Sequence, residues 1–354
     1  MGAAAGSPEA TGAVSAPDTA GGLAASIIIP AYNAARYIEG ALASACAQTE
    51  RRIEVLVVDD CSTDQTAALV RAAAERDGRV RLLRTVRNGG PAVARNLGLA
   101  SARGAWIAIL DADDCYEPRR LERLIALAEA QGADMCADNL LNVYESGECE
   151  PEPMLTTEQL PQPRRLSLTA FLEGNLVRSE RRVSFGFLQP MVRRAFLESH
   201  GLRYDETLRF SEDYTFYVAC LKAGASWWVT PEPMYRYLIR EGSLTEVQTA
   251  KDLDRLRQLD RQLLADPVIV ADPRLARVVG RHREDLDRRF YYRAFTDALK
   301  SRQWGGAARL SVHSSSAARL IALESLRQAP AILRKALRGG YRESRAKVPA
   351  EGSA

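Results

Sequence analysis

Short apolar runs alternate with amphipathic stretches along the first third of the chain. Several runs predict β-strands, at Ser26–Pro30, Ile53–Val58, Val80–Thr85 and Trp106–Leu110. The stretches after them carry apolar residues at helical spacing and predict helices near Arg36–Ala47, Asp64–Arg76, Gly90–Ala102 and Pro118–Ala130. Strands that are apolar on both faces and are joined by helices are typical of a parallel sheet covered on both sides. The pattern therefore predicts a doubly wound α/β fold with a mostly parallel sheet.

The regular alternation ends after the fourth of these helices. Residues 145–165 are rich in proline and polar residues and predict a long, exposed, irregular loop. Beyond it we expect ordered segments at Leu166–Gly174, Phe187–Val192 and Arg194–His200, a helix after Ser211, and a strand at Trp227–Val229. Leucines at helical spacing between Leu253 and Leu263 predict that the last part of the chain is helical.

Composition marks the ends of the folded region. Residues 1–24 are mostly small or polar, and such a segment predicts a disordered tail because it can bury little apolar surface. We expect the α/β domain over 25–250, with a first half at 25–115 and a second half at 116–250. Residues 251–354 then form a helical region that ends in a basic tail.

Charge and cysteine content narrow the class of protein. The 354 residues carry a net charge of +3, which is too small to indicate a nucleic-acid partner. The six cysteines form no C-x-x-C pair and no cluster with zinc spacing, so we expect reduced thiols in a cytoplasmic protein. The N-terminus lacks the basic and apolar regions of a signal peptide, and no apolar stretch is long enough to span a membrane.

Carboxylates gather where the predicted strands end, which is the edge at which doubly wound sheets bind ligands. Asp59 and Asp60 follow the second strand, and Asp111, Asp113 and Asp114 follow the fourth. Carboxylates this close repel one another unless a cation lies between them, and hard oxygen ligands suit Mg²⁺ or Mn²⁺ shared with a phosphate. A solvated acidic turn is the alternative interpretation.

Two common nucleotide motifs are missing. No G-x-G-x-x-G follows the first strand, which argues against a dinucleotide site of the Rossmann type. The P-loop pattern G-x-x-x-x-G-K-[ST] is also absent. A nucleotide would therefore be held by an aromatic face, by carboxylates on the base or ribose, and by a metal ion on the diphosphate.

Four sequence blocks carry a resemblance to a known family. They read SIIIPAYNAARYIEGALASACAQT, IEVLVVDDCSTDQT, NGGPAVARNLGLASARGAWIAILDADD and, at 211–229, SEDYTFYVACLKAGASWWV. In order and spacing they resemble family 2 glycosyltransferases of the GT-A fold, and most closely the bacterial exopolysaccharide transferases such as those that build succinoglycan. The resemblance implies an enzyme that transfers a sugar from a nucleotide-sugar donor to a saccharide acceptor.

The resemblance implies a pocket for the nucleotide base at the ends of the first two strands. Pro30, Ala31 and Tyr32 would line it, with the Tyr32 ring against a uracil, so a UDP-sugar is the expected donor. Asp60 would accept a hydrogen bond from the base. Asp59 would support the turn or contact the nucleoside.

The resemblance also implies a site for the diphosphate and its metal ion. Asp111 and Asp113 match the D-x-D pair, in which Asp113 binds Mg²⁺ or Mn²⁺ and Asp111 contacts the ribose or a water on the metal. Asn88 and Arg95 would approach the nucleotide and the donor sugar. Arg240 would neutralise diphosphate oxygens, and a surface ion pair is the alternative for this residue.

The fourth block implies the acceptor side. Asp213 matches the catalytic base and Glu212 its neighbour, while a simple helix N-cap is the alternative for Asp213. Trp227 is a candidate for stacking on a sugar ring. Because adjacent strand residues face opposite sides, we expect at least one of Trp227 and Trp228 to lie in the core.

These roles together describe an inverting transfer. A metal ion stabilises the charge that develops on the leaving diphosphate, while a carboxylate removes the proton of the attacking hydroxyl. One alternative is a non-catalytic protein on the same fold that binds a nucleotide-sugar or a glycan. Two enzyme classes fit less well: a processive synthase, because its Q-x-x-R-W motif is missing, and a nucleotidyltransferase, because its glycine- and lysine-rich loop is missing.

The basic C-terminal tail bears on location. Between Arg309 and Lys347, Lys and Arg outnumber Glu, and the apolar residues from Ile332 to Leu337 recur at helical spacing. A basic amphipathic helix can lie on an anionic membrane surface, where polyprenyl-linked saccharide acceptors are held. We therefore expect a peripheral position on the inner face of the cell membrane, and a helix that packs on the α/β domain is the alternative.

Overall fold

The structure is a computed structural model that describes residues 22–147, 149–176, 185–240, 249–312 and 317–323. The expected disordered tail at 1–24 and the basic helix near 332–338 therefore fall largely or wholly outside the described residues. The chain forms two compact units, residues 1–243 and 244–354, which are described separately. The domain boundaries at 24/25 and 250/251 stay predictions.

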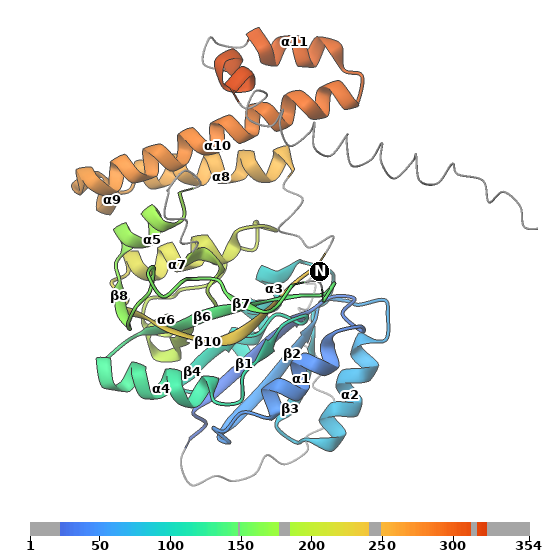
Figure 1. Ribbon diagram of the computed structural model, residues 1–354. Coiled ribbons are helices and arrows are strands. Elements are labelled where there is room, and N and C mark those ends of the chain that lie inside the picture. Colours follow the sequence, from blue (N-terminus) through green and yellow to red (C-terminus); the bar gives the residue numbers. More distant parts are fainter. Residues whose placement is uncertain (1–21, 148, 177–184, 241–248, 313–316, 324–354) are drawn as a thin grey trace, which may run out of the picture. The chain divides into compact units, whose positions relative to one another are not determined.

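The first half of the first unit is a parallel sheet with helical connections. Its strands are β1 (Ala25–Ala31), β2 (Ile53–Asp59), β3 (Val80–Arg84) and β4 (Trp106–Ile109), in the order β3-β2-β1-β4. The connecting helices are α1 (Ile38–Cys46), α2 (Thr66–Arg76) and α3 (Pro91–Ser101). Each lies within a few residues of its predicted position. The chain adds β2 and β3 on one side of β1 and then returns to add β4 on the other side. Because parallel crossovers are right-handed, this reversal of strand order puts α1 and α2 on one face of the sheet and α3 on the other (Figure 1).

The core of this half is apolar and tightly packed. The side chains of β1, β2 and β4 are almost all buried, as their continuous apolar sequence predicts. Gly98 allows α3 to approach the sheet, because a Cβ there would lie 2.4 Å from Ile28 Cγ2. Gly104 allows the turn into β4 to pass β1, since a Cβ there would lie 2.4 Å from the backbone of Ala25 and Ser26.

The second half extends the sheet with strands of both directions. Its strands are β5 (Cys115–Tyr116), β6 (Met135–Tyr144), β7 (Glu152–Pro153), β8 (Arg164–Leu166), β9 (Met191–Arg193) and β10 (Trp227–Ile239). Its helices are α4 (Arg120–Gln131), α5 (Leu168–Gly174), the short 3₁₀ turn η1 (Phe185–Phe187), α6 (Arg194–Ser199) and α7 (Glu212–Lys222). β9 pairs antiparallel with β4 and β6, and β6 pairs parallel with β10.

The structure corrects the prediction for this half at three places. The ten-residue strand β6 has no counterpart among the predicted strands, and β10 extends ten residues beyond the predicted end at Val229. The loop at 145–165 is also less irregular than expected. It contains β7 and the start of β8, and its Leu155 and Leu160 are buried. Apolar anchors at these two leucines hold the proline-rich segment against the sheet.

The second unit is helical, as the leucine spacing predicts. It comprises α8 (Ala250–Leu264), α9 (Pro267–Ala271), α10 (Pro273–Lys300) and α11 (Trp304–Val312). Thr249 and Asp252 form a capping box at the start of α8, and α10 begins at the Asp272 cap. No helix within the described ranges is both long and apolar enough to cross a membrane.

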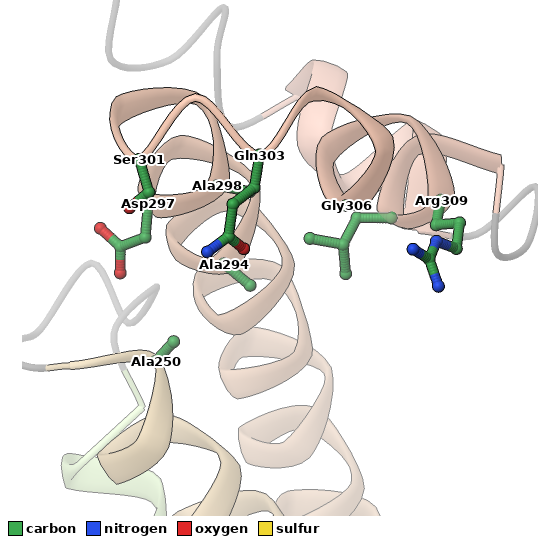
Figure 2. A pocket seen from close by; sticks show the side chains of 9 residues that line it. Ala250, Ala294, Asp297, Ala298, Ser301, Gln303, Gly306 and Arg309 are labelled. Carbon is green, nitrogen blue, oxygen red and sulfur yellow. The ribbon is translucent and has the colours of Figure 1, made fainter.

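An open pocket of about 550 Å³ lies within this helical unit (Figure 2). Its lining comes from the start of α8, the end of α10 and α11: Ala250, Ala294, Asp297, Ala298, Ser301, Gln303, Gly306, Arg309 and Leu310. None of the predicted site residues lines it. Its acidic side chain Asp297 is paired with Arg293, and its basic side chain Arg309 donates to the Gly305 carbonyl at 3.4 Å.

Candidate active site

Hydrogen bonds tie together the loops that follow β1 and β2. Asn33 N–H donates to Ser62 Oγ at 2.9 Å, and Asn33 Oδ1 accepts from Thr63 N–H at 2.8 Å. Asn33 holds a positive φ of 49°, which asparagine tolerates better than most residues. Asp59, which is buried, accepts from Ser62 N–H at 3.0 Å and pairs with Arg84 at 3.1 Å. Asp59 thus supports the turn, which is one of its two predicted roles.

Tyr32 follows β1 on this edge and leaves much of its ring in solvent. The residue is 52% exposed, which is unusual for a large aromatic side chain. Pro30 and Ala31 are the last residues of β1, and Ala31 is buried. The Tyr32 ring is therefore available to a flat ligand, and the base-pocket role of all three residues stays a prediction.

Asp60 binds the chain itself. Its carboxylate accepts hydrogen bonds from Thr85 Oγ1 at 2.8 Å, Gly89 N–H at 3.0 Å and Gly90 N–H at 2.7 Å. Asn88 Nδ2 donates to the Asp60 carbonyl at 3.1 Å. Asp60 and Asn88 therefore shape the loop before α3. The prediction that Asp60 accepts a hydrogen bond from a nucleotide base requires one more donor at a buried carboxylate that already has these partners.

The carboxylates that follow β4 have different surroundings. Asp114 is buried and accepts from the Tyr235 hydroxyl at 2.7 Å and from Leu238 N–H at 2.8 Å. Burial, with Asp111 and Asp113 nearby, raises its pKa well above the usual range. Asp113 is half-buried and accepts from Arg240 at 2.8 and 3.0 Å, both on Oδ2. Burial and then Asp111 raise the pKa of Asp113 as well.

Arg95 is the centre of the acidic network. This residue of α3 is only 3% exposed. Its guanidinium donates to Asp111 Oδ1 at 2.9 Å and to Glu212 Oε1 at 2.5 Å, and lies 3.1 Å from Asp213 Oδ1. The structure places Arg95 against three protein carboxylates, and its approach to the nucleotide and sugar stays a prediction. Its donors face protein carboxylates because burial of a guanidinium requires anionic partners.

Glu212 and Asp213 begin helix α7. The N-cap position belongs to Ser211, with a positive φ of 59°, so the alternative that Asp213 is simply the N-cap is wrong. The Asp213 side chain keeps 20% of its area exposed, while its Oδ1 is shielded and makes no hydrogen bond. Burial raises the pKa of Asp213 to about 8, with Arg95 opposing the shift and Glu212 adding to it. A carboxylate of this kind is suited to accept a proton near neutral pH.

Gln189 belongs to the site and is missing from the sequence-based candidates. Its Nε2 donates to Asp111 Oδ2 at 3.2 Å, so both oxygens of Asp111 have partners. The Gln189 carbonyl accepts from Arg120 Nη2 at 2.6 Å, and Arg120 pairs with Asp138 at 2.7 Å inside the core. The one available signal was Asp138, a charged residue within the apolar stretch that forms β6.

Trp227 does not face the site. Its side chain is fully buried, with its ring centroid 5.5 Å from that of Phe171 and 5.3 Å from that of Tyr217. The expectation that Trp227 stacks on a sugar is therefore corrected, because the inward position in β10 belongs to this residue. Trp228 is half-buried on the other face, as the alternation of strand residues requires.

The expected metal ion has one good protein ligand here. Among the described residues, no three acidic, histidine or cysteine side chains form a group that could hold a metal ion. Both oxygens of Asp111 are engaged, and Asp114 is buried. Asp113 is half-buried, and the cation Arg240 donates to only one of its oxygens, Oδ2. The donor set fits an ion that is bound through one carboxylate and completed by phosphate oxygens, a common arrangement for Mg²⁺.

Comparison with known proteins decides the family. Residues 26–192 match the sequence model of the family described as glycosyl transferase family 2. The chain is also 40% identical, over 283 residues, to the succinoglycan biosynthesis protein ExoU of Rhizobium meliloti (strain 1021), and the match covers 80% of each chain. The protein belongs to glycosyltransferase family 2. It is 44% identical over 238 residues to the succinoglycan biosynthesis protein ExoO of the same organism, with 67% of each chain covered.

Solved structures confirm the fold. Staphylococcus aureus TarS 1–349 in complex with UDP-GlcNAc superposes with a TM-score of 0.60 at 20% identity, covering 86% of this chain and 92% of that TarS fragment. The mannosyltransferase PcManGT of Pyrobaculum calidifontis, in complex with GDP-Man and Mn²⁺, gives a TM-score of 0.52 at 20% identity, with 89% and 83% covered. The GT-A fold that the sequence blocks imply is therefore confirmed.

Proposed function

We propose that this glycosyltransferase is an inverting, metal-dependent enzyme that moves a sugar from a UDP-sugar to a saccharide acceptor. The observation that carries the proposal is the position of Arg95, which joins Asp111, the first residue of the D-x-D sequence, to Asp213 at the start of α7. A carboxylate of the proposed donor side and one of the proposed acceptor side thus lie next to the two terminal nitrogens of one guanidinium. This neighbourhood supports a single site in which the diphosphate and the attacking hydroxyl meet at the same sugar.

The similar proteins support the substrate classes. ExoU and ExoO are named for succinoglycan biosynthesis, so we place this enzyme in the synthesis of an exopolysaccharide or another cell-surface glycan. TarS was solved with UDP-GlcNAc, and PcManGT with GDP-Man. The exposed Tyr32 ring and the match to the uracil-binding block favour a UDP-sugar.

Asp213 acts as the base in this mechanism. As the acceptor oxygen forms a bond to the anomeric carbon, its proton passes to the Asp213 carboxylate. The bond from the anomeric carbon to the diphosphate oxygen breaks at the same time, and the nucleoside diphosphate leaves with the electron pair. Attack from the face opposite the leaving group inverts the configuration, so an α-linked donor gives a β-linked product.

Asp113 would hold the Mg²⁺ or Mn²⁺ ion. When bound, the ion supplies positive charge to the leaving diphosphate. Arg240 lies beside Asp113 and adds a second positive charge at the same place, so we assign it to the diphosphate side. Tyr37 supports this position, because the Arg240 guanidinium lies 5.1 Å from its ring centroid.

The acceptor is proposed to be a polyprenyl-linked saccharide at the inner face of the cell membrane. The support is the basic and apolar pattern of the C-terminal segment, which lies outside the described residues. Sedimentation with anionic vesicles tests this part. Binding of the full chain at low salt that is lost in a chain ending at residue 329 supports it, and equal binding of both chains contradicts it.

A panel of sugar nucleotides tests the whole proposal. UDP-glucose, UDP-galactose, UDP-GlcNAc and GDP-mannose are each added with Mn²⁺ or with EDTA, and the melting temperature is measured. We expect stabilisation by a UDP-sugar that requires Mn²⁺, followed by release of UDP from that donor. Stabilisation by GDP-mannose alone, or release of UDP in excess EDTA at an unchanged rate, would contradict the donor or the metal assignment.

A further inference from the structure

The guanidinium of Arg95 joins three elements that are far apart in sequence. It projects from α3 to Asp111, which follows β4, and to Glu212 and Asp213, which begin α7. Arg95 and Glu212 are separated by 117 residues. This guanidinium is therefore a direct link between the half of the domain that resembles a nucleotide site and the helix that carries the proposed base.

The same guanidinium is closed to a ligand. Nη1 and Nη2 both donate to carboxylates, and Nε is buried. The Tyr204 ring covers the group at 5.4 Å from Cζ to the centroid. A phosphate or sugar could reach Arg95 only by displacing one of these groups. Displacement of Glu212 would leave its buried carboxylate without this partner, which is costly.

The two acidic residues of α7 use Arg95 differently. Glu212 accepts a hydrogen bond from Nη1 at 2.5 Å, and its side chain is buried. Asp213 Oδ1 lies 3.1 Å from the same nitrogen without a hydrogen bond, and part of its side chain remains exposed. Glu212 therefore anchors the helix start, and Asp213 keeps its capacity to accept a proton from a substrate.

We propose that Arg95, with Glu212, is a positioning residue for the acceptor side and not a ligand of the sugar donor. This inference rests on the proposed role of Asp213 as the base. Without the guanidinium, Asp111, Glu212 and Asp213 face one another as like charges, and the start of α7 moves away from the end of β4. A displacement of about 1 Å at a catalytic group can lower a rate by about 10²-fold.

The test separates rate from donor binding. We compare the wild type with Arg95→Gln, Arg95→Lys and Glu212→Gln, using calorimetry for UDP with Mn²⁺ and initial rates with the sugar donor that the panel identifies. Arg95→Gln should lower kcat by about 10²-fold, while the Kd of UDP changes by no more than about twofold. Arg95→Lys should recover part of kcat, because a single ammonium can pair with only some of the carboxylates.

Arg103→Gln is the matched control. Arg103 pairs with the buried Glu54 at 2.9 Å near the opposite, amino-terminal ends of β1 and β2, where Arg81 also contacts Glu54. This change removes a guanidinium from a buried carboxylate away from the site. We expect a lower melting temperature with kcat and the UDP Kd unchanged, which shows what a purely structural loss does.

Each result decides the proposal. A rise of about tenfold or more in the UDP Kd or in the KM for the sugar donor, with kcat at saturation retained, would make Arg95 a ligand of the sugar donor and overturn the proposal. If Arg95→Gln does not fold, Glu212→Gln gives the same decision through the same pair of measurements. A fully active Asp213→Asn would refute the base instead, whereas the UDP Kd of the Arg95 variants still reports on Arg95 alone.

Discussion

The two halves of the α/β domain satisfy their buried carboxylates in different ways. At the end of β2, Asp59 and Asp60 accept hydrogen bonds from backbone N–H groups of neighbouring loops, and Asp59 also pairs with Arg84 of the same half. At the start of α7, Glu212 and Asp213 depend on one arginine from the other half. Local loops thus shape the donor side, and a long-range ion pair holds the acceptor side. Changes in the donor-side loops should alter the affinity for the sugar donor. Changes in the acceptor-side ion pair should alter the transfer rate.

The largest effect is expected at Asp213. Asp213→Asn removes the group that takes the acceptor proton, and general-base catalysis contributes about 10²–10⁴-fold to a rate. Initial rates at saturating sugar donor should fall by this factor, with the UDP Kd little changed. A large loss of affinity for the sugar donor, with the rate at saturation retained, would assign Asp213 to the donor side and contradict this comparison of the two halves.

Asp113→Asn should lower both the transfer rate and the affinity for UDP. Loss of a group that stabilises the charge of the leaving diphosphate costs about 10²–10³-fold in rate. The UDP Kd in the presence of Mn²⁺ should rise as well, because Asp113 is the proposed metal ligand. Circular dichroism checks that the fold persists. Full activity of this variant in excess EDTA would remove the metal from the mechanism.

Asp60→Asn should have a smaller effect, which is confined to the donor side. An amide cannot accept from Thr85, Gly89 and Gly90 at once, and hydrogen bonds to a charged group contribute about 1.5–3 kcal/mol each. We expect a lower melting temperature and a weaker UDP affinity, with kcat at saturation nearly unchanged. A fall in kcat alone would show that the 89–90 loop acts on the acceptor side.

The pH dependence of the transfer rate should also distinguish the acceptor half of the domain from the donor half. Burial raises the pKa of Asp213 to about 8, so the transfer rate should rise with pH and level off above that value. Glu212→Gln removes a like charge, lowers the pKa of Asp213 and moves the rise to lower pH. An unchanged profile in this variant would mean that another group titrates.

The contribution of Asp213 to folding stability should fall as pH rises, whereas the transfer rate rises. The folded pKa of Asp213 lies above the unfolded value of about 3.9, so its contribution to stability is complete below that pH. The contribution is lost as pH rises through about 8. Denaturant unfolding of the wild type and Asp213→Asn between pH 5 and pH 9 measures it, and equal slopes for both would contradict the shift.

The sequence predicted the first half of the domain well because its signals are local. The strands of 25–115 are apolar runs, and their helices start close to residues such as Pro91 that favour a first turn. β6 escaped prediction because Asp138 and Asn139 interrupt its apolar pattern, and the partner Arg120 lies on a helix that looks solvated in sequence.

For the site residues, too, local sequence signals explain what could be predicted and what could not. The residue types at the strand ends, such as Tyr32 and Asp113, were found because they follow apolar runs directly. The carboxylate partners of Arg95 were not predicted, because nothing local reveals a partner 117 residues away. The burial of Trp227 likewise depends on which face of β10 meets Phe171, a choice that alternation leaves open.

The configuration of the first product tests the central claim most directly. An α-linked sugar donor is incubated with the enzyme and Mn²⁺ without acceptor, and proton NMR follows the anomer of the released sugar before it mutarotates. A base that activates the nucleophile opposite the leaving diphosphate predicts that the β-anomer forms first, and that Asp213→Asn slows its formation. Initial release of the α-anomer would contradict direct displacement and the role of Asp213 in this account.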